Sequence, residues 1–474
     1  MTSMLKETSD LADKTRKAMD IRRKRRVPIP YRLMVALALL IGIGTALLFL
    51  PWMTTQRITL LDALFTSTSA AAVTGLAVLT TSTAFTRLGQ WVILFLMQFG
   101  GLGLVVTMVL TLRLMGRHIS LMDRLAVSSS LGLASPRDIL RVLGRTVIVM
   151  LALEGIGALI LWIHWQSQGI VSPRDAAFYG LFHSVAAFCN AGFDLFGGLS
   201  QYPNGIPSDP ITLLTLGCLV ILGGLGIPVY MDLLFSREAH REGRQRRGLS
   251  LHTRLVLWSA LILILVGWAG LLISEYRIPG SLAGETFLHR LLLSWFQSVS
   301  ARTAGFASLS DFANLHEASR LLLICLMFIG SAPASMGGGI TTGTFSVLVL
   351  AMWSLARGYD TVRAGHRTIA MAMVWRAVTV LIISLGVVIV GTWLLLVSQP
   401  EMAFSPALFE VVSAFSTTGL SLTLTGTLNI FGRLLIILMM FWGRLGAVTI
   451  MLVLLKRDSR DSLVKYPEET VLVG

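Results

Sequence analysis

The sequence is poor in charged residues. Only 14% of its 474 residues are Asp, Glu, Lys or Arg, whereas a soluble domain has about 25%. Hydrophobic residues make up 54% of the chain, and the mean hydropathy is +0.75. Long apolar runs such as Leu33–Phe49 and Trp91–Leu112 approach the roughly 20 residues that cross a bilayer as a helix. This composition excludes a soluble enzyme or binding module and predicts an all-α integral membrane protein.

Acidic residues are the scarcer of the two charged kinds, with 25 Asp and Glu against 39 Lys and Arg. The basic residues cluster between the apolar runs, as in RRKRR (22–26) and REAHREGRQRR (237–247). All these clusters fall on one side of the expected topology, and this asymmetry places both termini in the cytoplasm. We expect a multi-pass protein of a bacterial cytoplasmic (inner) membrane, surrounded by membrane lipids. We expect no nucleic-acid partner, because no stacking aromatics interleave the basic runs.

Cysteine and nucleotide-binding motifs are also scarce. The only cysteines, Cys189, Cys218 and Cys325, lie in apolar segments without metal-site spacing, so disulfides and a metal centre are not expected. There is no Walker sequence and no GxGxxG after a strand, so regulation by a nucleotide requires another protein. We expect no cofactor bound by this chain. The first 28 or so residues are polar and basic, unlike a cleavable signal peptide.

The chain does contain four copies of one short segment. The copies are SAAAVTGL (69–76), AAFCNAGF (186–193), VSARTAGF (299–306) and SAFSTTGL (413–420). Their glycines are separated by 192 − 75 = 117, 305 − 192 = 113 and 419 − 305 = 114 residues. An aromatic residue precedes each glycine by ten positions, and a large apolar residue follows it. Agreement in spacing and flanks predicts four structural repeats.

Each repeat has the same expected order of elements. A long apolar helix comes first, near 31–52, 141–165, 253–276 and 370–398. A second follows the glycine, near 89–112, 210–235, 319–355 and 428–455. The segments between them, near 60–71, 175–188, 286–300 and 404–415, are half the length needed to span a bilayer and fit re-entrant helices. Such backbone is tolerated only inside protein or along a water-filled path. Four hairpins with glycine turns are the alternative, but they leave the half-length helices unexplained.

Four equivalent re-entrant segments suggest a pore on a pseudo-fourfold axis. Rings of main-chain carbonyls can replace the water shell of a cation, and glycine permits the backbone conformation that aims them inward. The neutral neighbours of the glycines argue against a calcium or anion path. Arg302 is expected to pack behind the pore rather than face the ion. The expected selectivity-filter residues are Val73, Thr74, Gly75, Asn190, Ala191, Gly192, Thr303, Ala304, Gly305, Thr417, Thr418 and Gly419.

This layout resembles the Trk/Ktr/HKT superfamily of potassium transporters over about residues 30–474, and the Ktr-type membrane subunit most of all. The resemblance implies potassium (K⁺) uptake through a filter with one glycine per repeat, with a possible dependence on sodium, and no enzymatic activity. It also implies a homodimer and a cytosolic ring of nucleotide-binding RCK-type subunits. The implied divisions are a basic N-terminal segment (1–29), four repeats (30–117, 118–236, 237–357, 358–456) and a C-terminal tail (457–474).

The third repeat carries an interruption, GSAPASMGGGITTGT (330–344), within its trailing apolar segment. A proline and five glycines in 15 residues cannot continue a straight helix. A break at membrane depth is expected only along a cavity, so we interpret it as a gate beneath the filter. The resemblance places an intramembrane gating loop here, and a simple kink is the alternative. The expected gate residues are Ser335, Met336, Gly337, Gly338 and Gly339.

A second repeated motif lies in the other trailing helices: QFGGLG (98–103), ILGGLG (221–226) and FWGRLG (441–446). For the first two copies we expect close helix packing alone. In the third, Arg444 replaces a glycine, and a charge in an apolar helix usually faces the interior. The resemblance places such an arginine near the gate, where it would repel cations and donate hydrogen bonds to loop carbonyls.

The other ionisable residues in apolar segments are few and scattered. Glu154 could relay protons, but a structural hydrogen bond is favoured. His183 is expected to be packed and hydrogen-bonded. Asp62, Asp175 and Glu410 are expected near the starts of the short helices, at the positive end of the helix dipole. Two alternatives to a pore stay open: a secondary carrier, against which the common orientation of the repeats argues, and a lipid-modifying enzyme, which lacks a catalytic constellation. The apolar end of the tail could be a dimer contact or disordered.

Overall fold

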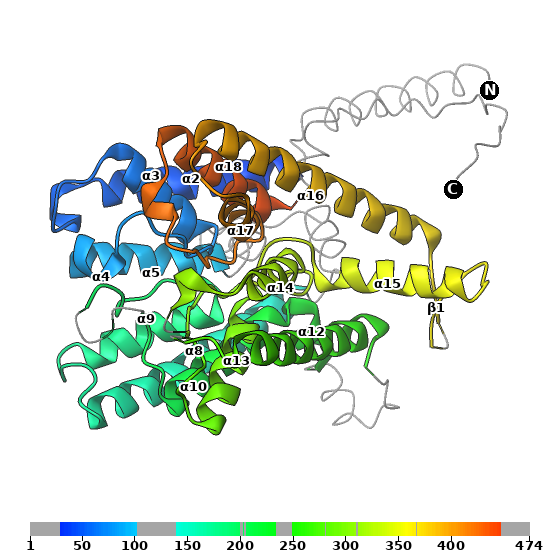
Figure 1. Ribbon diagram of the computed structural model, residues 1–474, viewed down its shortest axis with the longest axis horizontal. Helices are drawn as coiled ribbons and strands as arrows, with labels where there is room; N and C mark the ends of the chain where they lie inside the picture. The colour runs from blue at the N-terminus through cyan, green and yellow to red at the C-terminus, as the bar shows by residue number, and fades with distance from the viewer. Residues whose placement is uncertain are drawn as a thin grey trace, which may run out of the picture.

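The computed structural model describes residues 29–101, 139–199, 202, 205–233, 249–279, 281–309, 311–365 and 367–446. Within these ranges the chain is predominantly helical (Figure 1). The two described strands, β1 (Val362–Ala364) and β2 (Arg367–Ile369), form a small antiparallel hairpin with Val362 opposite Ile369. The predicted all-α class is confirmed. The N-terminal basic run (22–26), the second basic run (237–247) and the C-terminal tail (457–474) lie outside the described residues.

Four long helices lie where the sequence predicts the leading helix of each repeat. They are α2 (Ile29–Leu48), α8 (Ile139–Ser167), α12 (Leu251–Glu275) and α16 (Met371–Ser398). All four are long and apolar enough to cross a membrane. Many of their large apolar side chains point outward, for example Leu39, Ile163 and Ile389. In water such exposure would be unfavourable, so it indicates a surface that lipid covers.

Four short helices lie between the long ones. They are α3 (Leu60–Ala71), α9 (Ala176–Phe188), α13 (Phe287–Ser300) and α17 (Phe404–Phe415). At 1.5 Å per residue their 12 to 14 residues reach about 20 Å, too little for the roughly 30 Å of hydrocarbon. The C-terminal turns of all four are buried. The predicted re-entrant segments are therefore present, and we call them the pore helices.

The trailing helices follow the four glycine segments. They are α5 (Arg87–Gly101), α10 (Pro210–Gly224), α14 (Glu317–Phe328) with α15 (Thr342–Ala356), and α18 (Ile430–Leu445). The third is interrupted between Phe328 and Thr342, as the sequence predicts. The predicted extensions of α5 to residue 112 and of α18 to residue 455 lie outside the described residues. Short pieces complete the fold: α4 (Thr81–Ala84), η1 (Pro51–Met53), η2 (Phe312–Asn314) and η3 (Thr425–Thr427).

The second trailing helix departs from the prediction of an unbroken span over 210–235. It bends by 90° between Pro210–Gly224 and a following helix at Ile227–Leu233, with Gly226 in the left-handed region at φ 81°. The Ile227 amide bonds the carbonyl of Ala334, in the interrupted third repeat, at 3.1 Å. Packing alone is therefore the wrong interpretation of this GGLG copy, because a contact with another repeat replaces the helical hydrogen bond.

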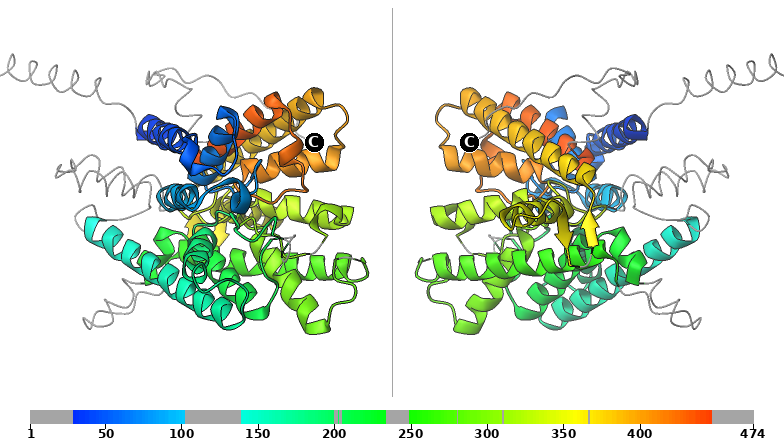
Figure 2. Two further views of the ribbon diagram at one scale, coloured as in Figure 1. Left: turned by 90° about the vertical axis from the view of Figure 1, so that its left-hand side faces the viewer. Right: turned by 90° about the vertical axis from the view of Figure 1, so that its right-hand side faces the viewer.

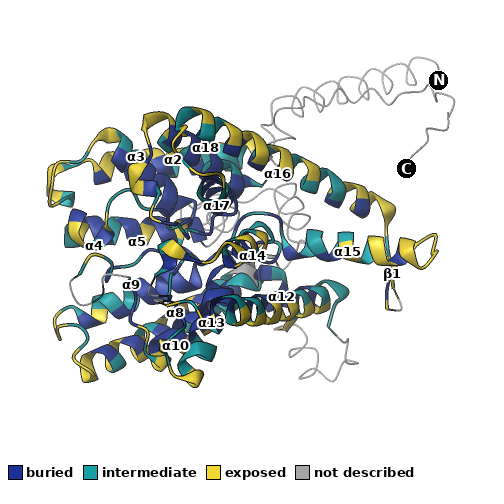
Figure 3. Cartoon of the chain, viewed as in Figure 1, coloured by how far each residue is buried: buried dark blue, intermediate teal, exposed yellow. Residues whose placement is uncertain are grey.

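The four repeats succeed one another around a common centre. Figure 2 shows the chain's colours passing from blue through teal and green to orange around the middle of the molecule. The buried residues gather in this middle and the exposed ones at the periphery (Figure 3). Salt bridges join neighbouring repeats through the pore helices: Arg433 of α18 bonds Asp62 of α3 at 2.7 Å, and Arg87 of α5 bonds Asp175, next to α9. The ring of repeats is thus closed between the fourth and the first.

Glycines let three trailing helices pack directly against the ends of pore helices. A β-carbon on Gly100, Gly223 or Gly443 would collide with the carbonyl of the last residue of α3, α9 or α17, respectively. These glycines come from the three copies of the repeated motif. At these three glycines the packing interpretation holds, because each trailing helix lies against the last turn of α3, α9 or α17; the second copy departs from it only at Gly226.

Gly223→Ala should destabilise the protein by about 1–3 kcal/mol, because its methyl group would overpack this contact. Gly155→Ala is the matched control: Gly155 lies within α8, and no atom lies within 4 Å of the place where its β-carbon would stand. That substitution should be neutral or slightly stabilising. Thermal unfolding of the detergent-purified proteins measures both, and equal melting temperatures would contradict the close contact.

Candidate functional site

Each pore helix ends in a short strand with the same unusual backbone. Two positions before each glycine stands a residue other than glycine in the left-handed region: Val73 at φ 57°, Asn190 at 56°, Thr303 at 76° and Thr417 at 50°. The glycines themselves have φ of 93°, 66°, 80° and 92° in chain order, and the residue between each pair is not left-handed. Because residues with left-handed and right-handed backbone conformations alternate, each strand stays extended and its successive carbonyls lie on one side. Four independent copies of a disfavoured conformation point to function.

The amides of these strands are tied back to the pore helices. The Gly75 amide donates to the Ser69 hydroxyl at 3.0 Å, and the Gly419 amide to Ser413 at 3.1 Å. The amides of Thr74, Ala191, Ala304 and Thr418 bond helix carbonyls at 2.7–2.9 Å. The carbonyls behave differently: within the described part of the chain, none of the three in each strand accepts a hydrogen bond. Buried carbonyls without partners are costly, so these are poised for a ligand.

The four strands close into a ring. The β-carbon position of each glycine lies against the carbonyl that precedes the glycine of the next repeat. In order, Gly75 contacts the Ala191 carbonyl, Gly192 that of Ala304, Gly305 that of Thr418, and Gly419 that of Thr74. The glycines are half-buried, while most strand residues around them are fully buried. Only glycine fits at these four contacts, and together they define a narrow common centre.

The surroundings of the ring suit a cation with few charges of its own. The predicted filter side chains are uncharged, and the Thr74 and Thr417 hydroxyls are buried without a partner. The C-terminal ends of α3, α9, α13 and α17 lead into the strands, so each helix presents the negative end of its dipole. Among the described residues, no group of three His, Cys, Asp or Glu could hold a metal ion. What the described residues of the ring do present is main-chain oxygens without hydrogen-bond donors.

The interrupted segment of the third repeat, residues 329–341, lies directly against the ring strands. A β-carbon on Gly337 would collide with the Thr303 hydroxyl, one on Gly338 would lie 2.6 Å from that of Thr417, and one on Gly339 would contact Ser416 at 3.1 Å. We call this segment the loop. Its three consecutive glycines thus allow it to approach two of the four strands at the end where the pore helix leads into the strand. We call this side of the ring the lower side.

Side-chain hydrogen bonds connect the loop to the ring. The Thr303 hydroxyl lies 2.6 Å from the Ser331 hydroxyl, and Ser331 also donates to the Arg302 carbonyl at 3.3 Å. The Asn190 amide lies 3.1 Å from the Thr303 hydroxyl in either orientation of the amide. The sequence offers Ser331 as one of the hydroxyls of the interrupted segment that can bond free backbone groups, but nothing in it shows that Ser331 would meet Thr303.

Arg444 also holds the loop in place through hydrogen bonds. Its guanidinium donates one hydrogen bond to the Met336 carbonyl in the loop and another to the Gly100 carbonyl at the end of α5. The side chain therefore joins three repeats directly below the ring. Of the remaining predicted gate residues, Ser335 has a buried hydroxyl without a partner, and Gly337–Gly339 form the contact with the strands.

Arg302 packs behind the ring, bonding the Ala260 carbonyl of α12 at 3.4 Å and the Gly330 carbonyl at 3.3 Å. Glu154 accepts a hydrogen bond of 3.0 Å from the Gln98 amide, the structural contact that we favoured. Asp62 is confirmed at the start of its pore helix, where it forms a capping box with Thr59. Asp175 likewise stands at the N-terminus of α9.

The expectation for Glu410 is wrong. It lies in the middle of α17 rather than at its start and is fully buried. The helix begins at Phe404, where the sequence predicts it, so Glu410 stands 410 − 404 = 6 residues beyond its first residue and away from the positive end of the dipole. Its carboxylate accepts hydrogen bonds from hydroxyls beyond the ring strand.

A family model described as TrkH, cation transport protein, matches residues 22–466. The chain belongs to this family. It is 36% identical to the Ktr system potassium uptake protein B of Bacillus subtilis over 94% of this chain and 96% of that protein. It is 35% identical to the protein of the same name from Vibrio alginolyticus, over 91% and 92% of the two chains. The predicted superfamily is confirmed, and the chain is a multi-pass membrane protein of a transporter family, not an enzyme.

Two further comparisons extend the family likeness. The chain is 32% identical to the potassium/sodium uptake protein NtpJ of Enterococcus hirae, over 95% of this chain and 98% of that one. Its fold matches the crystal structure of the potassium transporter TrkH from Vibrio parahaemolyticus with a TM-score of 0.70. That match covers 91% of this chain and 86% of the other at 19% identity, which establishes a shared fold.

Proposed function

We propose that this protein takes up potassium ions across a bacterial cytoplasmic membrane through the ring of main-chain carbonyls. The observation that carries the proposal is the combination of ring closure with carbonyls that accept no hydrogen bond among the described residues. Such oxygens replace the hydration shell of a monovalent cation. The names of the relatives, which are potassium uptake proteins, support potassium as the ion.

Sodium is the second ion of interest. One relative is named as a potassium/sodium uptake protein, and each ring strand has only one glycine. A strand with one glycine offers fewer well-formed carbonyl sites than one with two, so the ring admits looser selection. We propose that sodium either activates or accompanies potassium uptake.

The loop and Arg444 together form the proposed gate. The loop lies against the strands of the third and fourth repeats, and the Arg444 hydrogen bonds hold it there. A positive charge below the ring raises the electrostatic energy of a cation leaving it. Opening requires the loop to release the Thr303–Ser331 contact and Arg444 to release Met336. The alternative of a simple kink gives no reason for these contacts.

Regulation by partners completes the proposal. The sequence contains no nucleotide-binding motif, while its relatives are named as one protein of a Ktr system. We propose a homodimer that associates with a cytosolic ring of nucleotide-binding RCK-type subunits. Purification from cells that also express such a subunit tests this, and a monomer that captures none would contradict it.

Gly192→Ala should abolish most potassium uptake, because its methyl group would lie 2.7 Å from the Ala304 carbonyl oxygen and narrow the ring. The matched control is Gly169→Ala. Gly169 has nearly the same φ, 67° against 66°, but nothing lies within 4 Å of its β-carbon position. Both variants carry a similar backbone strain of about 1–2 kcal/mol, so only the ring contact distinguishes them.

Potassium uptake and growth at limiting potassium, in a bacterium that lacks its own uptake systems, measure the outcome. Uptake by Gly192→Ala at the level of Gly169→Ala, with equal amounts of protein in the membrane, would refute the carbonyl-ring mechanism.

Arg444→Ala should raise potassium flux at least about tenfold, since each charge-assisted hydrogen bond that holds the loop contributes about 1.5–3 kcal/mol. Arg444→Gln separates the two roles of the side chain, because it keeps amide donors but removes the charge. Flux through purified protein in potassium-loaded vesicles measures both variants. Wild-type flux in both folded variants would count against the gate.

A further inference from the structure

A second layer of polar contacts lies behind the ring, on its outer side. Nine positions before the ring glycine, two pore helices carry an ionisable residue: His183 in α9 and Glu410 in α17. Each contacts the residue two positions after the same glycine, Asp194 or Ser421. Both pore-helix side chains are fully buried. Each pair therefore ties a pore helix to the strand that has just passed through the ring.

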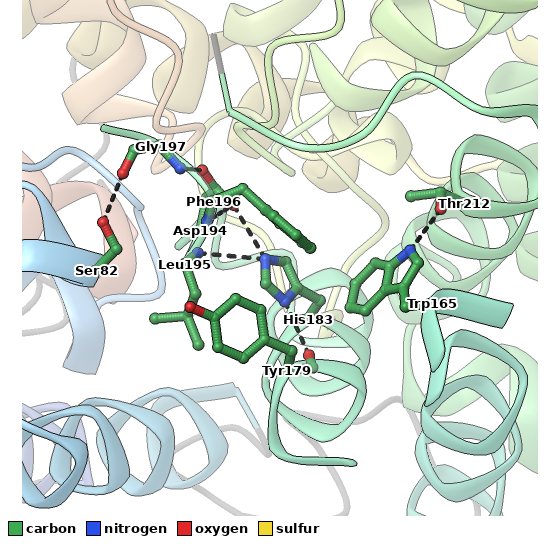
Figure 4. Close-up of polar contacts among 9 residues, drawn as sticks. All are labelled: Ser82, Trp165, Tyr179, His183, Asp194, Leu195, Phe196, Gly197 and Thr212. Carbon is green, nitrogen blue, oxygen red and sulfur yellow. Dashed lines mark hydrogen bonds and ion pairs between the residues drawn. The ribbon is translucent and has the colours of Figure 1, made fainter. Parts of the chain in front are cut away.

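His183 is held from both ends of its imidazole ring (Figure 4). Its Nδ1 lies 2.8 Å from the Tyr179 carbonyl oxygen, and its Nε2 lies 3.0 Å from the Asp194 carboxylate. The Trp165 and Phe196 rings pack around it with centroids 5.2 and 5.0 Å away. The Leu195 amide also lies 3.3 Å from Nε2, so both ring nitrogens are occupied by contacts with the pore helix and with the chain that follows the strand.

Asp194 connects His183 to the backbone that follows the ring strand. Its carboxylate accepts hydrogen bonds from the Phe196 amide at 2.8 Å and the Gly197 amide at 2.5 Å. The Ser82 hydroxyl of the first repeat bonds the Gly197 carbonyl at 2.5 Å. Figure 4 shows this chain of contacts from the pore helix to the neighbouring repeat. The outer end of the second strand is thus fixed on two sides.

Glu410 holds the outer end of the fourth strand through hydrogen bonds from hydroxyl groups. The Ser421 hydroxyl donates to one carboxylate oxygen at 2.8 Å, and the Thr425 hydroxyl donates to the other. Ser421 and Thr425 also bond each other at 3.0 Å. They stand two and six positions after Gly419 in the chain. No basic side chain among the described residues pairs with this carboxylate, so the hydroxyls are its described partners.

The two ionisable pairs lie on one diagonal of the ring, because the strands contact one another in the order of the repeats. The corresponding residues of the first repeat are Thr66 and Ala77, and the Thr66 hydroxyl bonds only its own helix, at the Asp62 carbonyl. In the third repeat Gln297, one position later, accepts from the Ser308 amide at 3.0 Å. The diagonal of repeats two and four is therefore the one restrained through charged or chargeable groups.

We propose that His183 with Asp194, and Glu410 with Ser421 and Thr425, are positioning residues that set potassium-over-sodium discrimination. Each pair holds the outer end of its own strand against its own pore helix, on opposite sides of the ring, so the carbonyls of these strands cannot move inward around a smaller ion. This inference rests on the proposed carbonyl filter and adds residues that do not themselves touch the ion. Loosening either pair lets the ring contract, which favours sodium.

The test compares the inhibition of potassium uptake by sodium in His183→Ala, Glu410→Ala and wild type. Each variant should show about a tenfold stronger inhibition by sodium, the effect of losing one hydrogen bond to a charged group. Glu410→Gln keeps the shape and the acceptor oxygen and should restore most of the discrimination. Uptake is measured as separate KM and maximal-rate values, because a purely structural role would lower the rate for both ions equally.

Two matched controls are available. Ser184→Ala lies next to His183 and is equally buried, but its hydroxyl bonds the Glu154 carbonyl in α8 rather than the strand. Thr66→Val occupies the position equivalent to His183 in the first repeat. Both should keep wild-type discrimination. Where an alanine variant fails to fold, the isosteric Asp194→Asn replaces it, and it should show the same stronger inhibition by sodium.

The outcomes separate this inference from the proposed function. Unchanged discrimination in folded His183→Ala and Glu410→Ala, or in Asp194→Asn, overturns the positioning role while leaving the filter intact. Normal uptake by Gly192→Ala overturns the filter itself. Altered discrimination in the pair variants, with unaltered controls, supports both.

Discussion

The structure depends on main-chain carbonyls that are held at the centre of a membrane protein without a hydrogen-bond partner. Each unpaired buried carbonyl costs about 1–3 kcal/mol, and four strands each contribute three. Among the described residues most of the strand amides bond helix carbonyls or the hydroxyls of Ser69 and Ser413. A strand that is satisfied on one side and unsatisfied on the other is stable only when something at the centre, an ion or water, supplies the missing contacts.

Close packing holds the strands in this state. The pore helices end beneath them, and Gly100, Gly223 and Gly443 let the trailing helices press directly against those ends. At the outer side, salt bridges such as Arg433 with Asp62 close the ring of repeats. The carbonyls cannot relieve their cost by turning away, because each strand is confined by its own pore helix, a trailing helix and the next strand. The favourable packing and salt bridges around the ring therefore offset the cost of the unpaired carbonyls.

Part of this structure could be predicted from the sequence, and there is a physical reason why the rest could not. The pore helices, the ring glycines and the interruption at 330–344 are encoded locally, in apolar length, spacing and glycine content. The bend after Gly224 is not, because it depends on the Ala334 carbonyl more than a hundred residues away. Nor do Val73, Thr303 and Thr417 indicate a left-handed backbone, since β-branched residues disfavour it. The contact of Glu410 with Ser421 emerges only after the repeats are aligned on their glycines.

One chain that forms all four sides of the ring can make each side different. An assembly of four identical subunits would instead place a loop on every side. Here a single loop reaches the strands of the third and fourth repeats, while the other trailing helices use their glycines for packing. The fourth strand is consequently held at both ends, by the loop at Thr417 and by Glu410 beyond Gly419. In the proposed gate, movement of the loop therefore acts on a strand whose outer end is fixed, and it changes access to the ring more than the spacing of the ring carbonyls.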